Sequence, residues 1–451
     1  MITSPVFAGK RYAVLGLARS GAAVAETLLA SGAEVIAWDN REEPRQLFDG
    51  RIELADPVSA DLSGCEGVIV SPGIPLNRHP IAAAAANAGV PIIGDIEIFA
   101  QARSHLPPHR VVGITGTNGK STTTSLVEHL LVEAGVAVCI GGNIGIPILA
   151  QQPLPEGGVY VLELSSYQID ITRSLDCDVA ALLNITPDHL DRYDGFESYV
   201  ASKARLFTMQ SPGHDAIFGM GDSETASIAA SESTRHDPGR FHQVDGAALV
   251  EQQKQWPSLQ GPHNLQNAAV AIAIVEALGV KPQQYERALT TFRGLPHRME
   301  RVAEKDGVLY INDSKATNPA SAAPALAAFP PVEGAQGPKP RIHWIVGGLP
   351  KGEDLGECEP FFGNVAAAYT IGDAGPAFAD LLEPYTEVHR SEMMAEAIRE
   401  AMAAARPGEI VMLSPACASF DQFRDFEARG DAFRQIVEAL MAVDDKGEDQ
   451  D

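Results

Sequence analysis

The chain has 451 residues, 45% hydrophobic and 21% charged, which is an ordinary composition for a soluble globular protein of several domains. The sequence holds 34 Lys and Arg residues against 59 Asp and Glu residues, and this net charge of −25 excludes nucleic-acid binding as a main function, because a polyanion requires a positive field. The five scattered cysteines and the absence of a membrane-span or signal-like apolar stretch predict a cytoplasmic protein, and nothing demands more than a monomer.

Short apolar runs, rich in β-branched residues, alternate with helical segments along the whole chain. Many of these runs end in Gly, Asp or Ser, as parallel strands do when functional loops follow their carboxyl ends. The pattern therefore predicts an α/β fold. In chain order the expected strands are 12–17, 33–39, 67–71, 159–164, 179–185, 341–348, 367–373 and 409–414.

Two stretches divide this pattern into three blocks. The Pro-rich "SHLPPHR" (104–110) precedes a glycine-rich loop, and "GLPHRMERV" (294–302) looks like a linker. We predict a Rossmann-like N-terminal domain, a central P-loop-type ATPase sheet and a Rossmann-like C-terminal domain. Their boundaries are 1–97, 98–302 and 303–451.

The first block nearly matches a dinucleotide-binding pattern. Gly16 and Gly21 lie between the first expected strand and a helix, and Asp39 follows the second strand. The glycine spacing is G-x-x-x-x-G, whereas the dinucleotide fingerprint is GxGxxG. A dinucleotide therefore stays one of the ligands that this block could bind.

The second block opens with a phosphate-binding loop, "GITGTNGKST" at 113–122. The strict P-loop pattern GxxxxGK[ST] fails, because position 114 is Ile. The physics still favours phosphate: Gly116 and Gly119 let backbone N–H groups approach, the helix expected at 123–134 adds a positive end, and Lys120 adds a charge. Ser121 or Thr122 can ligate Mg²⁺. The alternative is a plain Gly/Thr-rich turn before a helix.

Hard oxygen ligands follow two neighbouring expected strands. Glu163 lies near the end of 159–164, and Asp188, His189 and Asp191 come after 179–185. Taken alone, Glu163 would be a surface carboxylate. Beside a phosphate loop, it becomes a candidate Mg²⁺ ligand, and His189 becomes a candidate ligand or substrate contact.

Seven segments together resemble the Mur ligases, ATP-dependent amide-bond-forming enzymes of peptidoglycan synthesis. In this family's order, and over nearly the whole chain, they are "GITGTNGKST", "GGNIG", "ELSSYQ", "NITPDHLDRY", "GPHNLQNAAVA", "GLPHRMERV" and "NDSKATNP". The loop that fails the strict pattern is this family's usual form. The start "VLGLARSG", with "AWDN" and "SPGIP", and residues 413–433 look most like the D-glutamate-adding branch.

The resemblance implies that the first block binds a uridine diphosphate sugar rather than a dinucleotide. Asn143, from "GGNIG", would reach the same ligand. The implied contacts are Leu17, Ala18 and Arg19 at the first turn, Asp39, Asn40 and Arg41 at the uracil end, and Ser71, Pro72 and Gly73 at the diphosphate.

The resemblance also implies ATP and two Mg²⁺ ions in the central block. Ser121 and Glu163 would hold one ion, and His189 with a carbamylated Lys203 the other; without the family, Lys203 reads as an exposed helix lysine. Asn264 and Asn267 match adenine contacts, although Asn264 could instead cap a helix. The implied nucleotide-binding residues are Gly116, Thr117, Asn118, Gly119, Lys120, Ser121, Thr122, Asn264, Asn267, Arg298 and Asp313, and the implied catalytic ones are Lys120, Glu163, His189 and Lys203.

The third block would bind D-glutamate, whose two carboxylates require cations and N–H donors. Lys351 could also be a solvated loop lysine. The implied contacts are Lys315, Thr317, Lys351, Ser419 and Phe426.

The expected reaction joins D-glutamate to UDP-N-acetylmuramoyl-L-alanine through an acyl phosphate, with His189 a candidate to assist amine deprotonation. Three alternatives stay open at this point. They are another Mur-type amino-acid ligase, a P-loop NTPase without a ligase product, and an NAD-dependent oxidoreductase.

Overall fold

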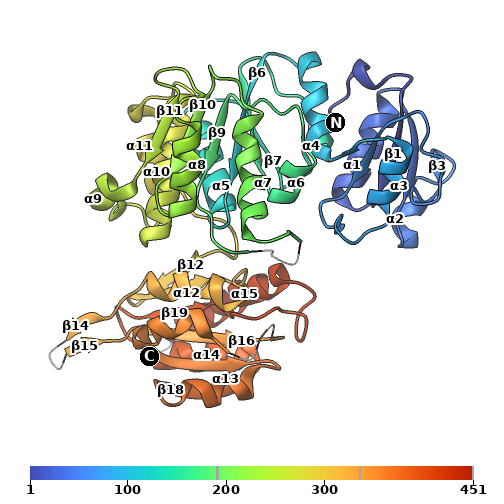
Figure 1. Ribbon diagram of the computed structural model, residues 1–451. Helices are drawn as coiled ribbons and strands as arrows, with labels where there is room; N and C mark the ends of the chain where they lie inside the picture. Colours follow the sequence, from blue (N-terminus) through green and yellow to red (C-terminus); the bar gives the residue numbers. More distant parts are fainter. Residues whose placement is uncertain (189–191, 335–336, 351, 353, 449–451) are drawn as a thin grey trace. The chain divides into compact units, whose positions relative to one another are not determined.

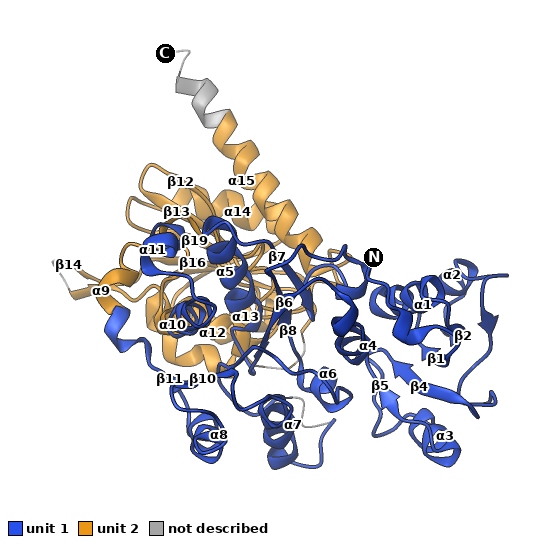
Figure 2. Ribbon diagram, turned by 90° about the horizontal axis from the view of Figure 1, so that it is seen from above, with its two compact units in different colours: residues 1–249, 266–289 blue, residues 250–265, 290–451 orange. Residues whose placement is uncertain are grey.

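The computed structural model describes residues 1–188, 192–334, 337–350, 352 and 354–448. Three sheets follow one another along the chain (Figure 1), and the predicted α/β fold is confirmed. The chain divides into two compact units, residues 1–249 with 266–289 and residues 250–265 with 290–451 (Figure 2). Helix α10 (Pro262–Ala277) contains one of the points of division.

The first sheet is parallel, with strand order β3-β2-β1-β4-β5. The chain leaves β1 in one direction toward β2 and later returns to β4 on the other side, so loops after β1 and β4 meet at the carboxyl edge. The strands are β1 (Arg11–Leu15), β2 (Glu34–Trp38), β3 (Glu53–Leu54), β4 (Cys65–Val70) and β5 (Ile92–Ile93), and the helices are α1 (Arg19–Ala30), α2 (Glu42–Gln46), α3 (Ile81–Ala88) and α4 (Asp95–Ala102).

The second sheet is also parallel, in the order β11-β10-β9-β6-β8-β7. Strand β6 lies between β9 and β8, so three loops meet at its carboxyl end. The strands are β6 (His109–Thr115), β7 (Val138–Gly142), β8 (Gly158–Glu163), β9 (Val179–Leu182), β10 (Asp215–Gly219) and β11 (Phe241–Val244). The helices are α5 (Lys120–Glu133), α6 (Ser166–Asp170), α7 (Phe196–Thr208), α8 (Ser223–Glu232), α10 and α11 (Pro282–Thr291).

The third sheet has the order β12-β13-β19-β16-β17-β18 and is parallel except for the edge strand β12. Two clusters of buried residues pack against it, one that includes α12 (Pro319–Ala327) and one that includes α14 (Met394–Ala404). The strands are β12 (Glu300–Lys305), β13 (Val308–Asn312), β16 (Ile342–Gly347), β17 (Val365–Ile371), β18 (Glu387–Glu392) and β19 (Ile410–Leu413), with a hairpin of β14 (Val332–Gly334) and β15 (Gly337–Lys339). The helices are α9 (Val250–Gln253), α12 (Pro319–Ala327), α13 (Gly375–Leu382), α14 (Met394–Ala404) and α15 (Phe426–Glu448).

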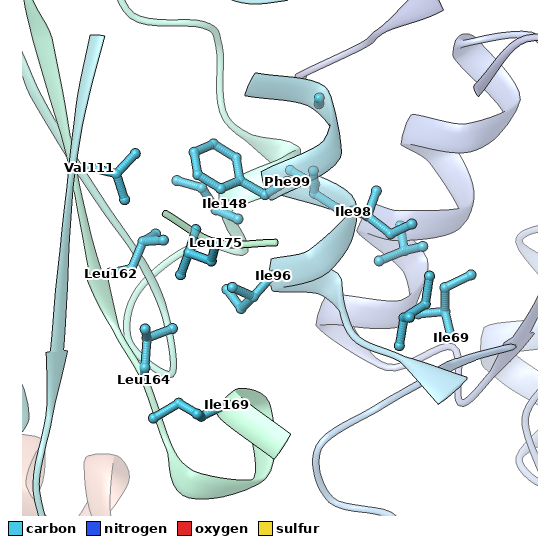
Figure 3. Packing of buried hydrophobic residues seen from close by; sticks show 14 of the residues in the cluster. Ile69, Ile96, Ile98, Phe99, Val111, Ile148, Leu162, Leu164, Ile169 and Leu175 are labelled. Atoms are coloured by element: carbon cyan, nitrogen blue, oxygen red, sulfur yellow. The ribbon is translucent and has the colours of Figure 1, made fainter. Parts of the chain in front are cut away.

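Helix α4 packs on both of the first two sheets. Ile96 and Phe99 belong to a cluster with Leu162 and Leu175, whereas Ile98 lies on the side of α4 toward Ile69 of β4 (Figure 3). The expected boundary after residue 97 therefore falls inside a helix, and the one after residue 302 falls inside β12. The three-domain boundaries stay a prediction.

Candidate active site

The phosphate loop links β6 to α5 through four residues, Gly116 to Gly119. Within the described part of the chain, the first turn of α5 has no acidic side chain and no side-chain cap. Its N–H groups and the positive end of the helix therefore stay available to an anion. The helix begins at Lys120, three residues earlier than expected, which places Ser121 and Thr122 in the first turn.

Both glycines of the loop are required by its backbone. Gly119 has a φ of +82°, and a Cβ there would lie 2.2 Å from Oδ1 of Asn267. Gly116 has a φ of +153°, and a Cβ would lie 3.0 Å from Cβ of Leu183. A side chain at either position would strain the loop. The same geometry places Asn267, a predicted adenine contact, directly against the loop.

The segment after β9 holds the loop in shape. Asn184 accepts a hydrogen bond from Thr117 N through its carbonyl (2.9 Å) and from Asn118 N through Oδ1 (2.8 Å). The amide of Thr186 donates to Oγ1 of Thr117 (3.0 Å), which also lies 3.0 Å from the hydroxyl of Tyr199. Sequence reasoning missed Asn184 as a loop support, although its place as a polar residue near the end of an expected buried strand was a usable signal.

Two lysines converge on one carbonyl of this loop. Lys120 Nζ donates to Gly116 O (2.9 Å) and Thr117 O (2.8 Å), and Lys203 Nζ donates to the same Gly116 O (2.8 Å). Lys203 is only 1% exposed, so the alternative of an exposed helix lysine is wrong. Burial, aided by the charge of Lys120, lowers the pKa of Lys203 well below its ordinary value. A neutral amine is the form that reacts with CO₂.

Glu163 ends β8, where its register partner on β6 is Ile114. The carboxylate is buried; Oε1 accepts from Asn143 Nδ2 (3.1 Å), and Oε2 has no partner among the described residues. An orphaned buried carboxylate oxygen fits the coordination of a hard cation.

A preformed protein cage for a metal is absent from the described residues, which contain no group of three or more suitably placed His, Cys, Asp or Glu side chains. Ser121 and Glu163 are both buried at this edge of the sheet. His189 lies outside the described residues.

A second constellation lies at the carboxyl edge of the first sheet. Ser71 Oγ donates to Gly16 O (3.3 Å), and Asp39 accepts from Leu17 N (2.8 Å) and Arg41 N (3.0 Å). Burial acts to raise the pKa of Asp39, but the hydrogen bonds from Arg41 and Leu17 outweigh it, and the pKa lies below its ordinary value. The remaining predicted contacts lie in the same loops: Ala18 immediately precedes α1, Arg19 begins it, Asn40 follows Asp39, and Pro72 and Gly73 follow Ser71.

The "GGNIG" loop joins the two constellations. Arg19 donates a hydrogen bond to the carbonyl of Gly145, and Asn143, two residues earlier, contacts Glu163. Asn143 was expected to reach the sugar nucleotide. Its observed partner is the candidate metal ligand.

In the other unit, β13 and β19 are neighbours, and the residues after them meet. Ser414 Oγ donates to Asp313 Oδ2 (2.8 Å), and Met299 N, next to Arg298, donates to Oδ1 (3.1 Å). Burial raises the pKa of Asp313 to about 7. Asp313 is thus a carboxyl group that holds its proton over much of the acidic range.

A buried arginine that sequence reasoning missed organises the predicted D-glutamate residues. Arg429 is 1% exposed and donates to Ser314 O (2.8 Å), Ser314 Oγ (3.0 Å), Cys417 O (3.0 Å) and Ala418 O (3.2 Å). These bonds hold the loops of Lys315 and Ser419 beside the start of α15.

Two other predicted D-glutamate residues, Lys315 and Thr317, lie in the loop that Arg429 holds. Lys315 Nζ lies 4.7 Å from the ring centroid of Phe426, and Thr317 N donates to Lys315 O (2.9 Å). Lys351 lies outside the described residues, so its role stays a prediction.

Asn264 borders a cavity of about 250 Å³ with Gln260, Met299 and Phe329. Its Nδ2 donates to Gln260 O (3.1 Å), and α10 begins two residues earlier at Pro262, so Asn264 lies inside the helix and not at its N-cap. Asn264 belongs to the same unit as Asp313, whereas Asn267 belongs to the unit of the phosphate loop.

A variant phosphate loop beside a buried carboxylate and a buried lysine, on a chain of three α/β sheets, defines an ATP-dependent ligase of the Mur type. Family models match in chain order: the Mur ligase MurD-like N-terminal domain over residues 10–94, the Mur ligase middle domain over 114–275 and the Mur ligase glutamate ligase domain over 297–417. The chain belongs to the Mur ligase family.

Within this family, the chain is highly similar in sequence to curated relatives that are named D-glutamate ligases. A UDP-N-acetylmuramoylalanine–D-glutamate ligase of Novosphingobium aromaticivorans is 66% identical over 441 residues, which are 98% of this chain and 97% of the relative. The protein of the same name from Sphingopyxis alaskensis is 59% identical, with 98% of this chain and 100% of the relative covered.

Solved structures of lower identity share the fold. A UDP-N-acetylmuramate-alanine ligase from Thermotoga maritima matches with a TM-score of 0.56 at 17% identity, covering 96% of this chain and 99% of its own. A UDP-N-acetylmuramoylalanyl-D-glutamyl-2,6-diaminopimelate–D-alanyl-D-alanyl ligase from Acinetobacter baumannii matches with a TM-score of 0.56 at 18% identity, covering 97% and 92%.

Proposed function

We propose that this protein is the ATP-dependent ligase that adds D-glutamate to UDP-N-acetylmuramoyl-L-alanine in peptidoglycan precursor synthesis. The observation that carries the proposal is the phosphate loop at the end of β6, where Lys120 and Lys203 share the carbonyl of Gly116, together with buried Glu163, whose Oε2 has no partner among the described residues. Near-full-length similarity to relatives of that name supports the choice of substrates. No helix among the described residues is long and apolar enough to cross a membrane. Action in the cytoplasm, as a monomer, stays a prediction.

The chemistry requires activation of a carboxylate, because an amine does not displace oxide from it. A carboxylate oxygen of the L-alanyl group attacks the γ-phosphorus of ATP, the bond to the bridging oxygen breaks, and ADP leaves. The amine of D-glutamate then attacks the acyl carbon and loses a proton, and phosphate departs with one former carboxylate oxygen. The chain contributes positioning and charge neutralisation.

The residues of the central sheet divide this work. Lys120 and the amides of the loop would bind the β- and γ-phosphates, and Asn267 would contact the adenine from its position against Gly119. Ser121 and Glu163 would hold one Mg²⁺ ion, and His189 with a carbamylated Lys203 the second. When bound, the ions would offset the negative charge that the phosphates and carboxylates bring together.

The sugar nucleotide and D-glutamate would bind at the other two groups of residues described above. The loops of Leu17, Asp39 and Ser71 would take the uridine diphosphate sugar, with Asn143 between it and Glu163. Arg298 and Asp313 would contact the phosphate and ribose of ATP. Lys315, Thr317, Lys351, Ser419 and Phe426 would bind the carboxylates and backbone of D-glutamate.

Isotope tracing tests the reaction. The full chain is incubated with ATP, Mg²⁺, D-glutamate and UDP-N-acetylmuramoyl-L-alanine labelled with ¹⁸O in its carboxylate. We expect one ¹⁸O atom in each phosphate released, and unlabelled phosphate would refute the acyl-phosphate route. Lys120→Ala is expected to abolish turnover, because the loop loses its only side-chain cation.

Amino-acid dependence separates the proposal from its alternatives. ADP release should require D-glutamate. Release with L-lysine or diaminopimelate instead would indicate another Mur-type ligase, and release without any amino acid would indicate a P-loop NTPase that makes no amide.

A further inference from the structure

Arg192 makes an unusual set of contacts for a side chain outside the predicted site. Its Nη2 donates to Pro72 O (3.2 Å) and Ile74 O (3.0 Å), and its Nη1 donates to Gly73 O (3.3 Å). Three successive carbonyls of one turn therefore face a single guanidinium group. The turn itself is closed by a hydrogen bond from Ile74 N to Ser71 O (3.0 Å), and we call residues 71–74 the SPGI turn.

The guanidinium also lies over an aromatic ring. Its Cζ lies 4.2 Å from the ring centroid of Tyr167, in the helix that follows Glu163. Tyr193 stacks on Tyr167 with centroids 5.9 Å apart, and the Tyr193 hydroxyl donates to Asp170 (2.9 Å) and lies 3.3 Å from Ser202 Oγ. Ser202 precedes Lys203 in α7. A continuous chain of contacts thus runs from the SPGI turn to the helix of the candidate metal-supporting lysine.

We infer that Arg192 is a positioning residue. It holds the SPGI turn, and with it the diphosphate of the sugar nucleotide, in a fixed position relative to the phosphate loop. The inference rests on the proposed function, because that function assigns the SPGI turn to the diphosphate. It adds a residue that couples the two sites. All of these contacts lie within one compact unit of the chain.

The geometry favours positioning over direct contact with substrate. A guanidinium has five N–H donors, and three are already directed at the carbonyls of the turn. The cavity beside it, lined by Ser71, Asn77 and Asp170 among others, measures about 70 Å³, which is room for a few water molecules and not for a nucleotide sugar. With the carbonyls turned toward Arg192, the amide of Gly73 remains to serve an anion on the other side of the turn.

Lysine cannot replace arginine here. Its ammonium group is a compact charge without the planar arrangement of N–H donors, so it cannot donate to these three carbonyls in the same geometry. Arg192→Lys keeps the charge and removes the fork, and Arg192→Ala removes both. Arg51→Lys is the matched control: Arg51 also lies over a ring, 5.4 Å from the centroid of Phe48, and donates to a carbonyl, Leu47 O (3.3 Å). It belongs to the first sheet's block but is outside the site.

Binding is measured by calorimetry on the full chain, separately for UDP-N-acetylmuramoyl-L-alanine and for a non-hydrolysable ATP analogue. We expect Arg192→Lys to raise the Kd of the sugar nucleotide about tenfold and to lower kcat/KM up to ~100-fold, because a small displacement of a bound reactant is costly. The Kd of the nucleotide should stay within about twofold of wild type. Added guanidinium ion should restore part of the activity of Arg192→Ala.

Hydrogen exchange provides a readout that does not depend on any ligand. The amides of Gly73, Ile74, Leu76 and Asn77 should exchange faster in both Arg192 variants and at the wild-type rate in Arg51→Lys. Unchanged exchange with an unchanged Kd for the sugar nucleotide would overturn the inference, as would an equal loss of nucleotide affinity, which indicates general destabilisation. If the wild-type chain itself fails to bind the sugar nucleotide, the proposed function fails, while the exchange rates still decide whether Arg192 holds the turn.

Discussion

Single residues of the phosphate loop set its shape through backbone geometry. We expect Gly119→Ala to abolish ATP-dependent phosphate release, because a Cβ would lie 2.2 Å from Oδ1 of Asn267 and the φ of +82° is unfavourable for alanine. The control is Gly135→Ala, whose φ is +77° but whose Cβ would meet nothing within 4 Å. That variant should lose only about 1 kcal/mol of stability and keep its activity. Equal activity of the two variants would contradict this account.

Substitution of the buried residue Glu163 should affect stability and catalysis in different ways. Glu163→Gln keeps the shape and the contact with Asn143 but removes a charge whose Oε2 has no partner among the described residues. We expect the melting temperature to be unchanged or higher, because an uncompensated buried charge is costly. Turnover with Mg²⁺ should fall by at least ~100-fold, since a hard cation loses its anionic ligand. Glu156→Gln, at an exposed turn, is the control and should change neither quantity.

Asp313 makes stability depend on pH. Burial raises the pKa of Asp313 to about 7 from an ordinary 3.8, so between these values the folded chain holds a proton that the unfolded chain has released. Stability therefore falls as pH rises through this window. The free energy of unfolding of wild type relative to Asp313→Asn should drop by about 2 kcal/mol between pH 5 and pH 7 in urea titrations. A difference that does not vary with pH would show that Asp313 is already ionised.

At the scale of elements, helix α7 delivers Lys203 to the phosphate loop as a buried amine. Burial lowers the pKa of Lys203 well below its ordinary value, which favours the neutral amine, the form that adds CO₂ to give a carbamate. With ¹³C-bicarbonate, we expect a carbamate resonance in the wild-type spectrum and none in Lys203→Arg, because a guanidinium does not form one. Turnover should fall in the same variant. An identical resonance in both proteins would place the modification elsewhere.

The strands that the sequence pattern predicted are the buried ones of the parallel sheets, such as β8 and β16, where every residue is apolar or shielded. Other strands escaped the pattern, and β12 and β11 show how packing, rather than composition, can make a segment a strand. In β12, Glu300–Lys305, four of six residues are charged, and antiparallel pairing with β13 holds it at the sheet edge. β11, Phe241–Val244, is four residues long and mostly half-buried, so no periodicity marks it.

The candidate site follows the same division. The loop residues Gly116, Gly119 and Lys120 could be predicted from the sequence, because they lie close together in one recognisable motif. Asn184 and Arg429 are not, because each supports a loop that is distant along the chain, 66 residues away for Asn184 and Asn118 and 115 for Arg429 and Ser314. A single sequence shows their types and positions but not which carbonyls they will face.

At the scale of the whole molecule, the net charge of −25 constrains what the protein can bind. All proposed substrates are anions, so they must be held by local donors and cations against a repulsive overall field. Duplex DNA, whose binding depends on extended positive surface, should not bind at 50 mM salt, as measured by fluorescence anisotropy. Binding that weakens with salt would reveal a basic surface that the composition conceals.

Helix α4 shows where relatives could exchange parts. Glu97 is buried and accepts hydrogen bonds from Arg173 N (2.7 Å), Ser174 N (2.9 Å) and Ser174 Oγ (2.8 Å), while Ile96 and Phe99 pack with Leu162. The helix thus packs on the central sheet through these residues, and on the first sheet through Ile98. In a chimera that takes its sugar-nucleotide domain from another ligase, the junction should lie before Asp95. A junction inside α4 would place side chains of the other ligase against the core of the central sheet, which Ile96 and Phe99 fill in this protein.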